Sequence, residues 1–293
     1  MRYFDQKASW KIHPIPYHRI ASSFRLIVFT FKFSYLYLRS KIRSLNMKIL
    51  VCITKAPDTT TKVTFTDNNS TFNESGVQWI INPYDEWYAL VRALELKEAG
   101  TATAVHLITV GKADTEPVIR KALALGGDEA IRIDADSNDS FFIATQIAEH
   151  AKTKGYDIIL TGKESIDYGN ASIGAMVAEL LDLPFISHVS KLDVNGGNVT
   201  INREIEGGEE TDLCASPLVI SCQKGMAEAR IPNMRGIMAA RTKPLNVVAP
   251  VAVDELTTIV SYDLPAQKTG VKMLDIEHMD ELVRLLHEEA KVI

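Results

Sequence analysis

Short apolar runs alternate along this chain with amphipathic segments of helix length, and this alternation restricts the possible folds more than any other feature. The runs are almost continuously apolar, as expected of strands that are buried on both faces of a sheet. The predicted strands are 48–54, 105–110, 130–133 and 157–161. The predicted helices are 82–99, 114–125, 139–154 and 172–181. This order predicts an α/β fold with a mostly parallel, doubly wound sheet.

The pattern changes after residue 181, where polar and apolar residues begin to alternate one by one. The segments 189–194 and 199–205 flank Asn195-Gly196-Gly197, which predicts a hairpin. Beyond the hairpin we expect one strand, an irregular stretch, a proline-bounded linker and an amphipathic helix, at 213–222, 223–250, 251–270 and 275–290. The last helix fits equally well a docked end of the domain or an arm that reaches a partner.

The first 46 residues differ from the rest of the chain in charge. They contain nine basic residues against one acid, whereas residues 47–293 contain 23 basic and 36 acidic residues. The apolar stretch at 24–38 is interrupted by Arg25 and Lys32 and is shorter than the ~20 residues that span a bilayer, so no stable membrane insertion is expected. We expect 1–46 to be a poorly ordered extension unrelated to function, with Met47 as the true start. An organelle transit peptide is the alternative.

Charge and residue counts disfavour several classes of function. A net charge of -5 disfavours a nucleic-acid binder that acts through bulk charge. The three cysteines, Cys52, Cys214 and Cys222, form no C-x-x-C pair, which disfavours a disulfide scaffold, a thiol redox motif and a cysteine zinc site. The seven histidines form no H-E-x-x-H array, and no Ser/His/Asp or Cys/His set stands out. The sequence therefore predicts neither a catalytic nor a metal site.

Polar or small residues follow three of the predicted strands, at the sheet edge where parallel α/β folds bind ligands. They lie at 54–58, 109–111 and 161–174. The third stretch leaves a buried strand through Gly162 and enters a helix near Ser172, where free backbone N–H groups can hold a phosphate. It matches neither G-x-G-x-x-G nor G-x-x-x-x-G-K-[ST], so neither a dinucleotide fingerprint nor a P-loop is supported. An ordinary strand-to-helix connection explains this loop at least as well.

Two other positions have both a structural and a functional interpretation. Asn82 and Pro83 are expected to cap and open the first helix, with Asp85 and Glu86 in its first turn, and a ligand contact is the second interpretation. Cys52 lies within a buried strand, where cysteine usually acts as a small hydrophobic side chain.

Two later segments have unusual charge patterns. Residues 203–211 (Arg-Glu-Ile-Glu-Gly-Gly-Glu-Glu-Thr) place opposite charges side by side at a strand end, and a solvated turn is the simpler explanation. Residues 224–243 contain five basic residues and one acid, with methionines among them. Flexible methionine beside a basic rim favours a protein-docking surface, and a core helix with a charged outer face is the alternative.

Taken together, these segments resemble the beta subunit of electron transfer flavoprotein. The likeness covers essentially all of 47–293 in order and spacing. Its motifs are Met-Lys-Ile-Leu-Val at 47–51, Asn-Pro at 82–83, Gly-Lys-Glu-Ser-Ile-Asp at 162–167, the signature at 203–211 and Pro-Asn-Met-Arg-Gly-Ile-Met at 232–238. Residues 1–46 have no counterpart in this family.

The resemblance implies an electron carrier subunit of a heterodimer and not an enzyme. In the family, a larger alpha subunit carries most of the FAD site. The beta subunit has a HUP-like adenine-nucleotide-binding fold that buries AMP, or a second FAD in electron-bifurcating relatives. Carried over, the nucleotide pocket contains Cys52, Asn82, Pro83, Tyr84, Asp85, Val110, Gly162, Lys163, Glu164, Ser165, Ile166, Asp167, Asn170, Ala171, Ser172 and Ile173. Glu204 would lie near the shared flavin and pair with an arginine of the alpha subunit.

The same resemblance implies a division of the chain and a set of transient partners. Residues 47–250 form the nucleotide-binding domain with its hairpin and extended loop, and 251–293 form a linker and a helical arm that docks on the alpha subunit. The segment 230–238 corresponds to the loop that docks onto a dehydrogenase. Its docking residues are Arg230, Met234, Arg235, Ile237 and Met238, with Met234 as the apolar anchor.

Electrons would then pass from dehydrogenases of the acyl-CoA dehydrogenase type, as in fatty acid β-oxidation, to a quinone oxidoreductase. We expect this to take place in the cytoplasm, or in the mitochondrial matrix if 1–46 is a transit peptide.

Three departures from the family pattern leave alternatives open. Many relatives have an acidic residue and a glutamine near the positions of Gly169 and Ser172, so the phosphate contacts and the choice between AMP and FAD stay open. Asp212 stands where the signature prefers an aliphatic residue. A bifurcating subunit with two flavins and a stand-alone nucleotide-binding enzyme or sensor of the same fold are the alternatives, although the latter lacks an evident catalytic base.

Overall fold

The computed structural model describes residues 47–195, 198–266 and 270–293, so the predictions for 1–46 lie outside the described residues. The described chain falls into two compact units. The larger unit contains 47–61 and 76–258, and the smaller contains 62–75 and the described part of 259–293. All of the candidate site residues lie in the larger unit.

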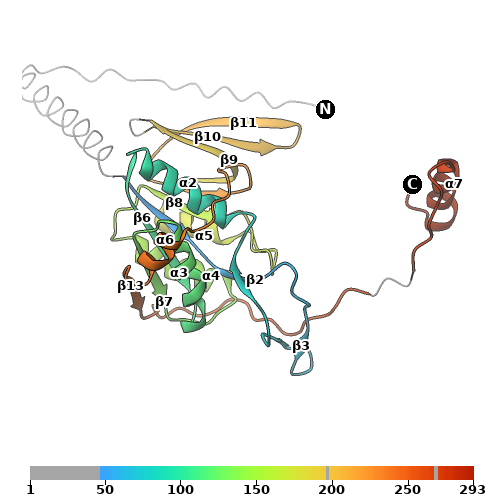
Figure 1. The fold of residues 1–293 in the computed structure, drawn as a ribbon, viewed down its shortest axis with the longest axis horizontal. Coiled ribbons are helices and arrows are strands. Elements are labelled where there is room, and N and C mark those ends of the chain that lie inside the picture. The colour runs from blue at the N-terminus through green and yellow to red at the C-terminus, as the bar shows by residue number, and fades with distance from the viewer. Residues whose placement is uncertain (1–46, 196–197, 267–269) are drawn as a thin grey trace, which may run out of the picture. The chain divides into compact units, whose positions relative to one another are not determined.

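The larger unit is built on one sheet, in which nine strands of the described chain have the order β11-β10-β9-β12-β8-β1-β6-β7-β13 (Figure 1). The strands from β9 across to β13 run parallel, and β10 and β11 extend the sheet antiparallel beyond β9. The strands are β1 Met47–Cys52, β6 Ala102–Val110, β7 Glu129–Ile133, β8 Ile158–Gly162, β9 Phe185–Asn195, β10 Asn198–Ile205, β11 Gly208–Ala215, β12 Leu218–Cys222 and β13 Leu245–Val248. The mostly parallel α/β sheet predicted from the sequence is confirmed.

Helices cover both faces of this sheet. One hydrophobic cluster contains residues of α2 (Glu86–Glu98) and α3 (Glu116–Leu125), and a second contains residues of α4 (Ser140–Ala151) and α5 (Ile173–Leu181). Along the chain, β6 and β7 are added on one side of β1, and β8 and β12 are then added on its other side. The strand order therefore reverses between β1 and β8, which is where folds of this type bind ligands.

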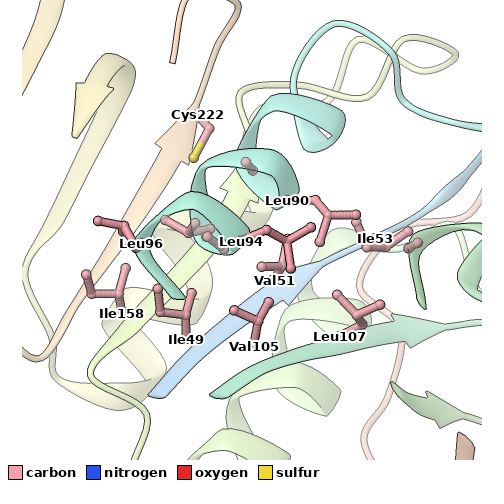
Figure 2. Close-up of a cluster of buried hydrophobic side chains, with 14 of the residues drawn as sticks. Ile49, Val51, Ile53, Leu90, Leu94, Leu96, Val105, Leu107, Ile158 and Cys222 are labelled. Atoms are coloured by element: carbon pink, nitrogen blue, oxygen red, sulfur yellow. The ribbon is translucent and has the colours of Figure 1, made fainter. Parts of the chain in front are cut away.

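The buried strand β1 explains why helices can cover both faces. Val51 belongs to the cluster of α2 and α3, whereas its neighbours Leu50 and Cys52 belong to the cluster of α4 and α5. Successive side chains of a strand point to opposite faces, so a strand that is apolar at every position is buried on both sides. Figure 2 shows the first cluster, in which α2 lies across β1 with Leu90 and Leu94.

The start of α2 corrects a prediction. The helix begins at Glu86 with Asp85 before it, and Asn82 and Pro83 do not cap and open it. Instead, the Asn82 side chain accepts a hydrogen bond from the Tyr84 N–H (3.0 Å) and forms a turn ahead of the helix. Asparagine stabilises such turns as readily as helix starts, so the local sequence does not separate the two.

The region after the hairpin needs three further corrections. The run 213–222 is not one strand, because Ser216-Pro217 separates the end of β11 from β12. Proline has no N–H to donate to a sheet and often ends a strand. The stretch 223–250 contains α6 (Met234–Ala240) and β13, so it is not irregular throughout. The last helix is shorter than predicted: α7 covers Met279–Leu285 and is followed by a wider helical turn at Leu286–Ala290.

The predicted hairpin is confirmed, since β9 and β10 pair antiparallel, although Gly196 and Gly197 at its tip lie outside the described residues. Four short strands between β1 and α2 had no prediction. In the larger unit, β2 (Lys55–Pro57) pairs with β5 (Trp79–Ile81), and in the smaller unit β3 (Phe65–Thr66) pairs with β4 (Thr71–Phe72). Within the described ranges, no helix combines the length and the apolarity needed to span a bilayer.

Candidate functional site

The candidate site lies where three neighbouring parallel strands end, at the point where the strand order reverses. β1 pairs in parallel with β8 on one side and with β6 on the other. Their last residues are Cys52 on β1, Gly162 on β8 and Val110 on β6. These are three of the positions predicted for the nucleotide pocket, and the structure places them at the same edge of the sheet.

The turn before α2 is bonded directly to the loop after β8. The Asn82 side chain donates through Nδ2 to the carbonyl of Glu164 (2.8 Å), and the Asp85 carboxylate accepts from the Glu164 N–H (3.1 Å). Asn82 and Asp85 are both buried. Two predicted site stretches that are distant in the sequence are therefore fixed to each other at this edge.

Two glycines allow helices to approach the end of β8 closely. A Cβ at Gly162 would lie 3.1 Å from Cγ of Glu86 and 3.3 Å from Cβ of Asp85. A Cβ at Gly174, in the first turn of α5, would lie 2.7 Å from Oγ1 of Thr161. Because real Cβ atoms avoid such distances, side chains at these two positions would push α2 or α5 away from the strand.

Glu86 is a buried carboxyl group at this edge, and sequence reasoning missed its role. It accepts hydrogen bonds from the backbone N–H and the hydroxyl of Thr54, both at 2.8 Å, immediately beyond β1. Burial raises its pKa from 4.5 to about 8, although the bonds from Thr54 act in the opposite direction. An acid in the first turn of a helix is usually exposed, and nothing in the local sequence distinguishes this one.

Burial changes the acidity of two further groups at this edge, Cys52 and Asp85. Burial, followed by the charge of Glu86, raises the pKa of the Cys52 thiol far above its ordinary value, so the reactive thiolate does not form. Burial also raises the pKa of Asp85, and the bond from the Glu164 N–H partly offsets this. Throughout the part of the chain that the structure describes, no group of three His, Cys, Asp or Glu side chains could hold a metal ion.

The loop 165–172 is organised by the side chain of Asn170. Its Oδ1 accepts from the N–H (3.0 Å) and the hydroxyl (2.6 Å) of Ser172, and its Nδ2 donates to the hydroxyl of Ser140 at the start of α4. The Ser165 N–H donates to the Asn170 carbonyl (3.0 Å) and closes the loop. Asn170 thereby fixes the entry to α5 beside the first residue of α4.

The starts of α4 and α5 differ in how they are capped. Asp139 accepts a hydrogen bond from the Phe142 N–H (2.7 Å) and caps α4. Ser172 makes no capping bond with its side chain, and the first turn of α5 contains no acid. The first N–H groups of a helix lack partners inside the helix and attract anions. At this edge α5 is therefore the better placed of the two to receive a phosphate.

The other predicted pocket residues lie around the same loops with varied exposure. Tyr84, Asp167 and Ala171 are exposed, and Pro83, Lys163, Ser165, Ile166 and Ile173 are half-buried. Lys163 pairs with Glu164 (3.1 Å). Their contacts with a nucleotide stay predictions.

Glu204 lies apart from this edge. It is exposed on β10, and two strands, β9 and β12, separate β10 from β8. Its neighbour Arg203 pairs across the sheet with Glu210 (2.6 Å) and Asp212 (3.8 Å) of β11. The structure does not bring Glu204 together with the pocket residues, and its assignment to the flavin stays a prediction.

The predicted docking residues lie on and just before α6. Met234 is 73% exposed and Met238 56%, and Arg235 and Ile237 are also exposed. Arg230 differs, because its guanidinium makes two hydrogen bonds to the Glu98 carboxylate (2.7 and 3.0 Å) at the end of α2. Four of the five residues are therefore available at the surface, and the charge of Arg230 is engaged within the chain.

Comparisons with known proteins agree with this architecture. The family described as "Electron transfer flavoprotein domain" matches residues 69–253. Electron transfer flavoprotein subunit beta of Bacillus subtilis is 37% identical over 264 residues, covering 84% of this chain and 100% of that protein. The subunit beta of Syntrophomonas wolfei is 36% identical, over 79% of this chain and 91% of that protein.

A plant relative extends the likeness to an organelle protein. Electron transfer flavoprotein subunit beta, mitochondrial, of Oryza sativa subsp. indica is 30% identical over 84% of this chain and 100% of that protein. The match of the family over most of the chain and the identity with full-length beta subunits lead to one conclusion. This chain belongs to the electron transfer flavoprotein beta-subunit family.

Proposed function

We propose that this chain is the beta subunit of a heterodimeric electron transfer flavoprotein, and that it binds an adenine nucleotide at the carboxyl ends of β1, β6 and β8. The observation that carries the proposal is the bonding of the α2 turn to the β8 loop through Asn82 and Asp85. It creates a fixed edge at the point of strand reversal, and the groups there do not form a nucleophile. A binding role without catalysis fits a carrier whose cofactor supplies the chemistry.

The residues at this edge divide into two roles toward the nucleotide. The uncapped start of α5, beyond Ser172, suits the phosphate of AMP, because helix N–H groups favour negative charge. Cys52, Val110 and the turn 82–85 supply apolar and polar walls for the remainder of the molecule. A second FAD would use the same phosphate contacts. Counting the FAD and AMP in the purified heterodimer distinguishes the two nucleotides.

FAD supplies the redox chemistry of the proposed heterodimer, and this chain contributes only a part of its site. The exposed Glu204 on β10 is the residue that we assign to it, paired with an arginine of the alpha subunit. The outer strand β11 also leaves Leu213 79% exposed. An apolar residue this exposed at a sheet edge suits coverage by another subunit.

We assign the docking of dehydrogenases to α6 and the residues that flank it, 230–233 and 241. Ile231 (90% exposed), Met234 and Met238 form the apolar part of this surface, and Arg235 and Arg241 provide exposed charge. A small apolar anchor with a charged rim favours fast, specific and short-lived association, as an electron shuttle between an acyl-CoA dehydrogenase and a quinone oxidoreductase requires.

Co-expression tests the proposal. The chain is produced with the alpha subunit of the same organism, and the complex is purified through a tag on the alpha subunit alone. We expect a yellow 1:1 complex whose flavin is reduced by an acyl-CoA dehydrogenase and its substrate. A colourless chain that stays monomeric and turns over ATP by itself would contradict the proposal and favour a stand-alone nucleotide-binding protein.

A separate measurement on native cells tests the location. We propose that the protein acts in the cytoplasm, with 1–46 playing no part in targeting. Fractionation of the native cells, followed by N-terminal sequencing, is expected to give cytoplasmic protein that starts at Met47. Processed protein in a mitochondrial fraction would reject this.

A further inference from the structure

The end of α3 and the end of α6 exchange hydrogen bonds through two basic side chains. Arg120 of α3 donates through one nitrogen to the carbonyl of Ala240 (2.8 Å), the last residue of α6, and to that of Lys243 (2.7 Å) just beyond it. In return, Lys243 donates through Nζ to the carbonyls of Leu123 (2.9 Å) and Gly127 (2.6 Å), at the end of α3. The last carbonyls of a helix lack partners inside the helix, so each basic side chain satisfies the end of the other helix.

The other end of the docking segment, defined here as residues 230–243, is fastened to α2. The indole of Trp87 donates to the carbonyl of Arg230 (3.1 Å). The Arg230 guanidinium binds Glu98 at 2.7 and 3.0 Å and lies 3.7 Å from Glu95. The segment is thus tied down on both sides of its exposed residues.

Between these fastenings, α6 lies directly on the end of α3. A Cβ at Gly236 would lie only 2.2 Å from the carbonyl oxygen of Ala124, so the two backbones touch. Asn233 caps α6 by accepting from the Gly236 N–H (2.8 Å). Ala240 is buried, whereas Met234 and Met238 point to solvent. A helix of seven residues is too short to be stable alone, so these contacts decide its conformation.

We infer that Arg120 and Lys243 are positioning residues for docking, which hold Met234 and Met238 in their binding arrangement before a partner arrives. This inference rests on the proposed docking function. A segment that is already ordered loses little conformational freedom on association, and the partner's binding free energy is not spent on folding it. The docking surface is therefore preformed and not assembled on contact.

The inference predicts a specific kinetic signature. Arg120→Ala, studied in the complete heterodimer, should raise the apparent KM of an acyl-CoA dehydrogenase for the heterodimer by about tenfold. The kcat at saturating heterodimer should stay the same, because the docked complex is unchanged. Arg120→Lys keeps a basic donor, so its KM should lie between those of the parent and Arg120→Ala. A structural defect elsewhere in the chain would not be corrected by this donor.

Gln146→Ala serves as the matched control. Gln146 lies on α4, whose buried apolar residues belong to the cluster on the opposite face of the sheet from α3. Its side chain exchanges two hydrogen bonds with the backbone of Val251 (2.9 and 2.8 Å). Gln146→Ala removes two hydrogen bonds to backbone groups, as Arg120→Ala does. It should therefore lower the free energy of unfolding without changing the KM of the dehydrogenase for the heterodimer. An unchanged KM for Arg120→Ala, with Met234→Ala still raising it, would overturn the inference and leave the docking role intact.

Hydrogen exchange on the unmodified heterodimer covers the case in which Arg120→Ala does not fold. The amides of 237–243, several of which donate within and just after α6, should exchange far more slowly than unstructured amides. Exchange at unstructured rates would overturn the inference. A heterodimer without flavin would instead refute the proposed function, and this exchange measurement would still report on the segment.

Discussion

The edge of the sheet at β1 and β8 and the docking segment place their polar and apolar groups in opposite ways. At the edge, polar side chains such as Asn82, Asp85 and Glu86 are buried and bonded. In the docking segment, apolar side chains such as Met234 and Met238 are exposed, while the polar bonds lie beneath them. Each arrangement reverses the usual distribution of side chains in a soluble domain.

This difference separates two kinds of functional surface. Buried polar groups fix the shape of a site that holds one ligand for a long time, and their loss affects folding as well as binding. Exposed apolar groups bind a partner briefly, and their loss leaves folding almost untouched. Substitutions in the two regions should therefore differ in their effect on the free energy of unfolding.

The largest effect is expected from the pH dependence of Glu86. Its pKa is about 8 in the folded chain against 4.5 in the unfolded one, so the folded state binds the extra proton between these values. Stability from this group is full below pH 4.5 and is lost as the pH rises toward 8, by roughly 3–5 kcal/mol in all. Urea unfolding at a series of pH values should show this decline in the parent and not in Glu86→Gln.

The exposed Glu179 supplies the control for that series. Glu179→Gln makes the same chemical change at the surface of α5, so it should keep the slope of the parent. If the free energy of unfolding depended on pH in the same way in the parent and in Glu86→Gln, the pKa of Glu86 would not be raised in the folded chain.

Gly174→Ala should have the next largest effect. The added Cβ would meet Oγ1 of Thr161 at 2.7 Å and the ring of Phe185 at 3.0 Å, which should lower the free energy of unfolding by about 1–3 kcal/mol. It should also displace the start of α5 and reduce the bound nucleotide. Gly208→Ala is the matched control, since a Cβ there would meet nothing within 4 Å. Equal nucleotide content in the two variants would remove α5 from the site.

Met234→Ala should have the smallest effect on folding and a clear effect on docking. Its side chain is 73% exposed, so the free energy of unfolding should change by less than about 0.5 kcal/mol. Reduction by a dehydrogenase should slow by about 5–10-fold at low heterodimer concentration, with flavin content unchanged. Val247→Ala, at a 54% exposed position of β13, is the control. Equal rates for both variants would exclude Met234 as the anchor.

The parallel core of the fold was predictable from the sequence, and some of its elements were not. Residues 49–53, after Lys48, are apolar at every position, which is typical of a strand buried on both faces. The turn at Asn82 was wrongly assigned to the helix. The Asn82 side chain bonds to Glu164, which is far away in the sequence, so the local sequence does not reveal this contact. β13 has four residues at the edge of the sheet, too few for a periodic pattern.

The site was predictable in its loops and not in its buried acid. The glycine-rich exit from β8 marks a close approach of the backbone, and Gly162 and Gly174 do allow one. Glu86 has the local sequence of an ordinary first-turn acid, and only the packing of α2 against Thr54 and Gly162 buries it. Arg120 and Lys243 were not identified because each acts on the end of the other's segment.

The central claim is that this chain holds an adenine nucleotide beside a flavin that it shares with an alpha subunit. Its most direct test is to denature the purified heterodimer and measure the FAD and AMP that it releases. The account predicts one FAD and one AMP per heterodimer, with less AMP in Gly174→Ala. Two FAD without AMP would indicate a bifurcating flavoprotein, and FAD without a second nucleotide would contradict the nucleotide site.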